Sequence, residues 1–337
     1  MAVPSRNRER LKRLGPFAAL AALFAGGGVA YAVGQTTGTV SACATTPAQT
    51  LAVNGSPVST LAGESACSTV TYTVPTVTET VTTTTPAAPL SGYVFDDEFN
   101  GSAGTAPDSG KWNVYGGTMP NRWGSECFVN DRAHIELDGN GHLAETATYN
   151  PGGVPCKNGS GPYESGGMDT GDFPTPLFSY LQGDAEARIK VPCESGLGMW
   201  PAWWATGSSW PNGGEIDFLE MMHTANAGFD AKQTLHASTS TGGTWSLGHH
   251  DVATTKWCED FHVFGAKWSP NSVAFTVDGQ VEATFTRASL QAGWDWPFET
   301  APEKLFLDLQ TGDQGGTVDN SSLPQTMLVD WVRVSAS

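Results

Sequence analysis

From Ser91 onward, short apolar runs alternate with glycine, asparagine, aspartate and proline, and no long stretch keeps an apolar period of 3.6 residues. Runs of this length are typical of single strands. Within Ser272–Val277 every second residue is apolar, and Asp278-Gly279 follows, which predicts a strand entering a tight hairpin turn. Similar runs are Ala185–Val191, Leu305–Leu309 and Met327–Val334. Many short strands within about 250 residues predict an all-β sandwich or barrel.

Residues 1–34 have the features of an export signal. Basic side chains extend to Arg13, an apolar run follows, and Ala30-Tyr31-Ala32 fits the small-x-small motif that signal peptidase cleaves. The alternative is an uncleaved anchor that tethers the chain to a membrane through residues 14–34, although Pro16 makes this stretch a poor helix. We expect cleavage, and in both cases a secreted or cell-surface protein.

Residues 35–90 are rich in threonine, alanine and proline and carry almost no charge. Such a low-complexity linker buries too little apolar area to offset the entropy of ordering its backbone, which predicts an extended stalk. A strand interpretation of its valine–threonine alternation is the alternative. Cys43 and Cys67 lie inside this segment and could close a small loop.

The remaining segment, residues 91–337, carries 12 Lys+Arg and 31 Asp+Glu, a difference of 12 − 31 = −19. This charge excludes a general nucleic-acid binder, because a phosphate backbone would be repelled, and suits a neutral polysaccharide. Four of the six cysteines lie here, and export favours disulfides among them. The sequence leaves all three pairings open. These cysteines are Cys127, Cys156, Cys193 and Cys258.

Three acids interrupt the otherwise apolar segment Trp210–Met222, namely Glu215, Asp217 and Glu220. A buried strand does not normally hold three unpaired carboxylates, because each costs several kcal/mol to bury. On a strand, the first two acids share one face. The third returns to that face if a one-residue β-bulge occurs near Phe218-Leu219. The pattern predicts three acids that face water, a cation or a substrate.

With such a bulge, the two glutamate Cα atoms would lie roughly 13 Å apart, at about 3.3 Å per residue. Their side chains could then bring the carboxyl groups to the ~5–5.5 Å typical of a retaining glycosidase. That chemistry needs one carboxylate as nucleophile and one carboxylic acid as proton donor. Asp217 could hydrogen-bond to the nucleophile and couple the titrations. A calcium-binding or merely solvated acidic strand is the alternative.

This motif of Glu, an aliphatic residue, Asp, two apolar residues and Glu resembles that of glycoside hydrolase family 16. Its bulged spacing resembles the laminarinase-like, or endo-β-1,3-glucanase, branch. The resemblance covers roughly residues 91–337 and implies a concanavalin A-like β-jelly-roll sandwich with a cleft on its concave sheet. Other segments that agree in order and spacing are Phe95–Gly101, Gly183–Pro192, Gly198–Trp204, Thr234–His236, Gly315–Asp319 and Met327–Val334.

The resemblance further implies a retaining, endo-acting hydrolase with β-1,3-glucan as the default substrate. Glu215 would be the nucleophile, Asp217 its modulator and Glu220 the acid/base, with no cofactor for catalysis. The substrate-binding residues that it implies are Trp200, Trp204, His236, Trp123, Glu126 and Gln310. Tryptophan faces can stack on sugars, but a core position is the alternative for each Trp.

Glu98, the backbone of Gly141 and Asp330 match the positions of a structural calcium that is common in the family. Hard oxygen ligands suit calcium, and simple solvation of these acids is the alternative. We expect a monomer whose partner is a polysaccharide.

Two departures from the family pattern affect the substrate. Ser165-Gly166-Gly167 stands where laminarinase-like members usually carry Ser-Gly-Arg, and Asp308–Gly312 differs from an Asn- and Gly-rich segment. A galactan or another cell-wall polymer is therefore an alternative substrate. The alternative functions are a transglycosylase that remodels a wall, a non-catalytic glycan-binding module, and a stalked adhesion protein.

Overall fold

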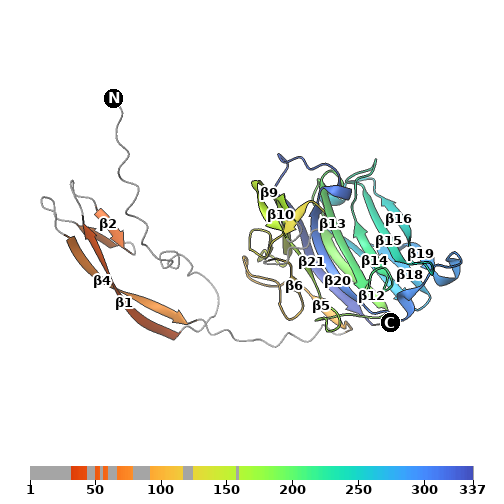
Figure 1. The fold of residues 1–337 in the computed structure, drawn as a ribbon, viewed down its shortest axis with the longest axis horizontal. Coiled ribbons are helices and arrows are strands. Elements are labelled where there is room, and N and C mark those ends of the chain that lie inside the picture. The colour runs from red at the N-terminus through yellow and green to blue at the C-terminus, as the bar shows by residue number, and fades with distance from the viewer. Residues whose placement is uncertain are drawn as a thin grey trace, which may run out of the picture. The chain divides into compact units, whose positions relative to one another are not determined.

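The structure is a computed structural model, and it describes 32–43, 50–53, 56–59, 67–78, 92–116, 124–156 and 159–336 (Figure 1). The chain divides into two compact units, Met1–Thr85 and Pro86–Ser337. Among the described residues, no helix has the length and apolar character needed to cross a membrane. Of the predicted export signal, residues 1–31 lie outside the described part of the chain.

In the first unit, β1 (Ala32–Cys43) pairs antiparallel with β4 (Cys67–Thr78), and β2 (Thr50–Val53) pairs with β3 (Ser56–Ser59). The register places Cys43 opposite Cys67. Over these four strands the structure follows the strand interpretation and not the extended stalk. The physical reason is the alternation of valine and threonine, whose branched side chains favour extended backbone.

The second unit is a β-jelly roll of two sheets without a closed barrel, as predicted (Figure 1). The main path of its ten-stranded sheet runs in the order β19 (Gln280–Thr286), β18 (Ser272–Val277), β17 (His262–Ser269), β12 (Gly183–Lys190), β21 (Gln325–Ser335), β9 (Leu143–Cys156), β10 (Gly159–Ser165) and β7 (Glu126–Phe128). Beside this path, β5 (Phe95–Asp97) pairs with β21, and β8 (Ile135–Leu137) pairs with β9.

The seven-stranded sheet carries the candidate site. Its strands run in the order β16 (Thr244–Val252), β15 (Asp230–Ser238), β14 (Glu215–Glu220), β13 (Met199–Gly207), β20 (Glu303–Thr311), β11 (Gly167–Asp169) and β6 (Asn113–Val114). In the middle of this sheet, β14 lies between β15 and β13, and β13 lies between β14 and β20. The backbone groups of both strands are therefore paired on both sides.

Side chains from both sheets share one hydrophobic core. On β12, Ala185, Ala187 and Ile189 are fully buried and alternate with partly exposed residues. From the other sheet, Trp203 and Phe218 enter the same core, with ring centroids 4.9 Å apart. This one-sided burial explains the alternating sequence pattern of the strands, because successive side chains point to opposite faces.

The predicted hairpin after Ser272–Val277 is confirmed. Val277 pairs with Gln280, which leaves Asp278 and Gly279 as a two-residue turn. Their φ angles are +49° and +78°, both in the left-handed region. Two-residue hairpins of this kind favour Asp-Gly for that reason.

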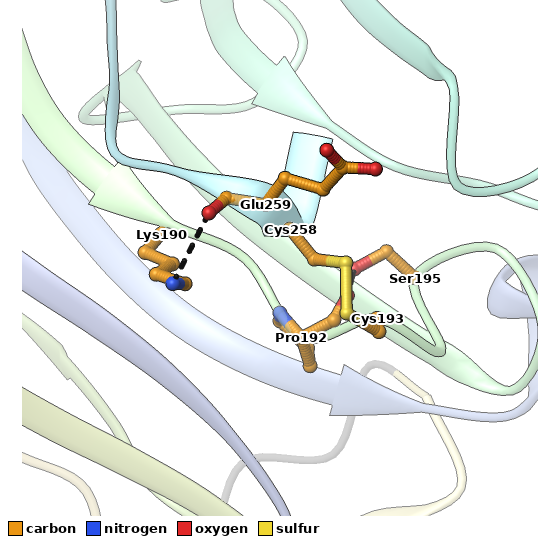
Figure 2. Close-up of a disulfide and its surroundings, with 6 residues drawn as sticks. All are labelled: Lys190, Pro192, Cys193, Ser195, Cys258 and Glu259. Carbon is orange, nitrogen blue, oxygen red and sulfur yellow. Dashed lines mark hydrogen bonds between the residues drawn. A yellow bond between two sulfur atoms is a disulfide. The ribbon is translucent and has the colours of Figure 1, made fainter. Parts of the chain in front are cut away.

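A disulfide joins Cys193, which follows β12, to Cys258 in the 3₁₀ turn Trp257–Glu259 (Figure 2). Beside it, the Lys190 ammonium donates a hydrogen bond of 3.4 Å to the Glu259 carbonyl. The two cysteines are 65 residues apart in the sequence, and the segment between them contains β14, which holds Glu215, Asp217 and Glu220. Cys127 is also disulfide-bonded.

Replacing both Cys193 and Cys258 with serine should lower the free energy of unfolding by about 2–4 kcal/mol, because a long closed loop restricts the unfolded chain. Denaturant titration of the wild type and the double variant, both without reductant, measures the difference. Equal stability of the two proteins would contradict this role for the disulfide.

Candidate active site

A β-bulge places three acids on one face of the seven-stranded sheet. Along β13, Trp204 pairs with Asp217 while Trp203 pairs with Leu219, so Phe218 is the extra residue. Phe218 and Leu219 are both fully buried in the core. This confirms the bulge that the sequence predicts near these two residues.

Gln233 of β15 supports the bulge from inside the sandwich. Its fully buried carboxamide donates hydrogen bonds to the Phe218 carbonyl at 3.2 Å and to the Thr276 carbonyl at 3.3 Å. Thr276 belongs to β18 of the opposite sheet. One side chain therefore satisfies a carbonyl at the irregular point of β14 and links that point to the facing sheet.

Strand register defines which side chains accompany the acids. His236 of β15 lies opposite Glu215, and Trp204 of β13 lies opposite Asp217. Ala202 lies between Glu220 on one side and Asp308 of β20 on the other. We call this set the carboxylate face, and its members are Trp200, Trp204, Glu215, Asp217, Glu220, His236, Asp308 and Gln310.

His236 contacts the two acids nearest to it. Its Nε2 lies 3.1 Å from Asp217 Oδ2 and 3.9 Å from Glu215 Oε1. Burial is the main cause that lowers the pKa of His236, which favours the neutral imidazole. Glu215 also accepts a side-chain hydrogen bond from Trp210, whose ring is 54% exposed.

The remaining acids of the face each accept an indole N–H. Trp200 Nε1 donates to Glu220 Oε1 at 3.1 Å, and Trp204 Nε1 donates to Asp308 Oδ2 at 2.9 Å. Gln310 Nε2 donates to the other oxygen of Asp308 at 2.7 Å. Each carboxyl is thus held in a fixed orientation by at least one donor.

Burial raises the pKa values of all three acids on β14, and the charges of neighbouring acids add to the effect at Glu215 and Asp217. The pKa of Glu215 rises to about 9, mainly through burial and then through the charge of Asp217. The pKa of Asp217 rises well above its usual value, through burial and the charge of Glu220. Burial also raises the pKa of Glu220. Since the acids interact, they share protons and carry fewer than three charges at neutral pH.

Two residue sets bear on metal binding. Ligand atoms of Glu215, Asp217 and His236 lie within 4.8 Å of one another, which is close enough to hold a cation. The predicted calcium ligands are engaged differently. The Glu98 carboxylate binds Arg333 through two hydrogen bonds of 2.8 and 2.9 Å, and Asp330 binds Arg188 at 2.5 Å.

Those two arginines engage carboxylate oxygens of the kind that calcium binds. Gly141, the third predicted ligand, has a φ of +91° in the turn between β8 and β9. The calcium site stays a prediction from the resemblance.

The structure gathers most of the predicted substrate-binding residues, but not all. Trp200, Trp204, His236 and Gln310 belong to the carboxylate face. Trp123 lies outside the described residues. Glu126 is fully buried.

The Glu126 carboxylate accepts the backbone N–H groups of Thr311 at 2.6 Å and Gly124 at 3.3 Å. Thr311 is the last residue of β20. Glu126 thus fixes the end of that strand through hydrogen bonds to its backbone.

Two members of the site have no role assigned from the sequence. Trp210 lies in the segment that carries the acids, but only the fold brings its indole to Glu215. Asp308 appears in the sequence as a departure from a family pattern. Its contact with Trp204 depends on the pairing of β13 with β20, which joins residues 104 positions apart. No local motif signals such a pair.

The second unit has two sheets without a closed barrel, and one of them carries a cluster of carboxyl groups. This combination is typical of a class of carbohydrate-active proteins. Comparison with known proteins identifies the family. Residues 137–333 match Glycosyl hydrolases family 16. The chain belongs to this family, as the motif around Glu215 predicts.

Among curated relatives, the chain is similar to a keratan-sulfate endo-1,4-β-galactosidase of Sphingobacterium multivorum, at 29% identity over 76% of this chain and 58% of that protein. It is also similar to a β-glucanase of Rhodothermus marinus, at 31% identity over 73% of this chain and 86% of the relative. The laminarinase catalytic domain of Thermotoga maritima MSB8 aligns with a TM-score of 0.61 at 27% identity, over 73% of this chain and 98% of that domain.

The raised pKa of Glu215 predicts a pH-dependent stability. The unfolded chain loses this proton near 4.5 and the folded chain near 9, so the folded state becomes less favoured as the pH rises between these values. Glu215→Gln removes the titration. Its stability relative to wild type should increase by about 1–3 kcal/mol between about pH 5 and pH 9.

Denaturant midpoints of both proteins across this pH range measure the difference. Glu282→Gln, which changes an exposed carboxyl on β19 of the other sheet, serves as the control. A constant difference between Glu215→Gln and wild type over this range would contradict the assignment of a raised pKa to Glu215.

Proposed function

We propose that this protein is a retaining, endo-acting hydrolase of a β-linked polysaccharide, with β-1,3-glucan as the first substrate to test. The observation that carries the proposal is the bulge at Phe218, which places Glu215 and Glu220 on one face with Asp217 between them. Family membership and the similarity to a β-glucanase support the reaction class.

In the first step, the Glu215 carboxylate attacks the anomeric carbon and forms a glycosyl ester while the bond to the leaving sugar breaks. The Trp210 hydrogen bond favours its anionic form. Burial is the main cause of the raised pKa of Glu215, and a proton retained by Asp217 removes the second cause, which is the charge of Asp217 itself. Asp217 thereby adjusts the ionisation of the nucleophile.

Glu220 donates its proton to the leaving oxygen in the same step. Burial raises its pKa, which favours the protonated form of the carboxyl, and the Trp200 N–H fixes its orientation. In the second step, the Glu220 carboxylate takes a proton from water, and that water attacks the anomeric carbon and releases Glu215. Two displacements at one carbon retain the anomeric configuration.

The substrate would contact the indoles and the polar groups of the carboxylate face. Trp204 is only partly buried, and its ring stacks on Phe306 with centroids 3.9 Å apart. We expect this indole to stack on a sugar of the substrate. Trp200 is more enclosed, at 7% exposure, and contributes mainly its hydrogen bond to Glu220.

A β-galactan is the second candidate substrate. Gly167 replaces the arginine expected beside β20, where it pairs with Asp308. An added Cβ at Gly167 would lie 3.0 Å from Asp308, Phe128 and Tyr115, so no side chain fits there without rearrangement. The similarity to a galactosidase favours testing galactans beside glucans.

We also propose export from the cytoplasm, with residues 1–34 removed or retained as an anchor. The Cys193–Cys258 disulfide supports an oxidising location.

Variants of the two glutamates test the proposed roles. Glu215→Gln and Glu220→Gln should each lower kcat on the polymer by about 10²–10⁴-fold or more, because each removes one proton or bond-forming group. An aryl glycoside with an acidic leaving group separates the roles. Its departure needs no proton, so Glu220→Gln should still release the aryl group in a burst while Glu215→Gln should not.

NMR of the newly released reducing ends should show the β-anomer first for wild type. Glu282→Gln, an exposed change on the other sheet, should match wild type within about twofold, since surface changes away from a site have small effects. Release of the α-anomer, or full activity of Glu215→Gln, would contradict the proposal.

A further inference from the structure

Asp308 is a fully buried carboxyl in the middle of the carboxylate face. Its two oxygens accept hydrogen bonds from two different side chains, Trp204 at 2.9 Å and Gln310 at 2.7 Å. Trp204 comes from the neighbouring strand β13, whereas Gln310 is two residues further along β20 and on the same face of the sheet. The carboxylate therefore joins one aromatic and one polar member of the face.

The far end of Gln310 carries an acceptor without a partner. Its Oε1 is buried and, in the described part of the chain, has no hydrogen-bond partner. A buried acceptor without a partner is costly, and a sugar hydroxyl could supply the missing donor. Because Nε2 is fixed by Asp308, the orientation of this oxygen depends on that carboxylate.

We propose that Asp308 is a positioning residue, which holds the Trp204 indole and the Gln310 carboxamide in the orientation that binds the sugar beside the catalytic acids. The inference rests on the proposed function. Trp204 would supply a flat face, fixed between Phe306 below and Asp308 at its N–H edge. Preorganised side chains lose less conformational entropy when the polymer binds.

The two hydrogen bonds are strongest with the ionised form of Asp308. Both partners donate an N–H, and both oxygens of the carboxylate accept, whereas the hydroxyl oxygen of a protonated carboxyl is a weaker acceptor. An asparagine has the same shape but only one acceptor oxygen, and its NH₂ group would oppose the other donor. Asp308→Asn is therefore the minimal change that breaks one contact and keeps the volume.

The surroundings of Asp308 are acidic. Burial is the main cause that raises its pKa to about 7. The titratable groups that face it are Glu126 of β7, Tyr115 after β6, Glu145 of β9, and Asp217 and Glu220 of β14. Below about pH 7 the protonated form predominates, so we expect weaker binding of the sugar as the pH falls.

Steady-state kinetics on laminarin, a soluble β-1,3-glucan, test the inference in the full chain. Asp308→Asn should raise KM about tenfold, the loss expected for one hydrogen bond to a charged group, and change kcat less than about threefold. In wild type, KM should rise as the pH falls from about 8 to 6, and in Asp308→Asn this rise should be absent.

Trp204→Phe keeps a ring and removes the N–H, which permits a double-mutant cycle. If Asp308 acts through Trp204, the fold-increase in KM of the double variant should be well below the product of the fold-increases of the two single variants. Glu282→Gln is the control for loss of one carboxyl elsewhere. Thermal unfolding of every variant checks that it is folded at the assay temperature.

Four results would overturn the inference. An unchanged KM in a folded Asp308→Asn variant, or independent effects of the two substitutions, would exclude positioning through Trp204 while leaving the hydrolase intact. An identical pH dependence of KM in wild type and Asp308→Asn would exclude the ionised carboxyl as the active form. Wild type that releases no sugar from laminarin or from β-galactans would overturn the proposed function and this inference together.

Discussion

The bulge at Phe218 is the constraint on which the site depends. Without it, Glu220 would point into the core with the neighbouring apolar residues, where an unpaired carboxyl costs several kcal/mol. The irregular strand leaves a carbonyl that β pairing does not satisfy, and Gln233 supplies its donor while also reaching Thr276 of the facing sheet. The core side of the sandwich and the carboxylate face are therefore coupled through a single buried amide, and substitutions at Gln233 would affect both.

Around this bulge, burial and charge act in opposite directions. Packing β14 between β13 and β15 excludes water and raises the pKa of each acid, whereas the N–H donors on neighbouring strands stabilise the anions. Trp200, Trp204 and Trp210 each donate to one carboxyl of the face. An indole has an apolar face and a polar N–H edge, and in each of these three tryptophans the polar edge orients an acid.

Sequence reasoning predicted the features that have a local cause. The Asp278-Gly279 hairpin, the all-β sandwich and the bulge follow from alternation and its interruption, and the structure confirms them. For residues 35–90 the sequence favours an extended stalk, and strands such as β1 and β4 are the alternative interpretation. Composition alone does not show which threonine-rich segments pair. Contacts between distant strands carry no local signal, so the burial of Glu126 and the link from Asp308 to Trp204 emerge only from the fold. The calcium ligands and the roles of the acids stay predictions.

Trapping the covalent intermediate tests the central claim most directly. A 2-fluoro glycoside of the cleaved sugar, with a good leaving group, slows the second step more than the first, so a glycosyl ester should accumulate. Intact mass measurement followed by peptide mapping should locate one sugar on Glu215, with none on Asp217 or Glu220, and Glu220→Gln should still form the ester. An adduct on Glu220, or turnover of the polymer with inversion and no adduct, would contradict the assignment of roles on this face.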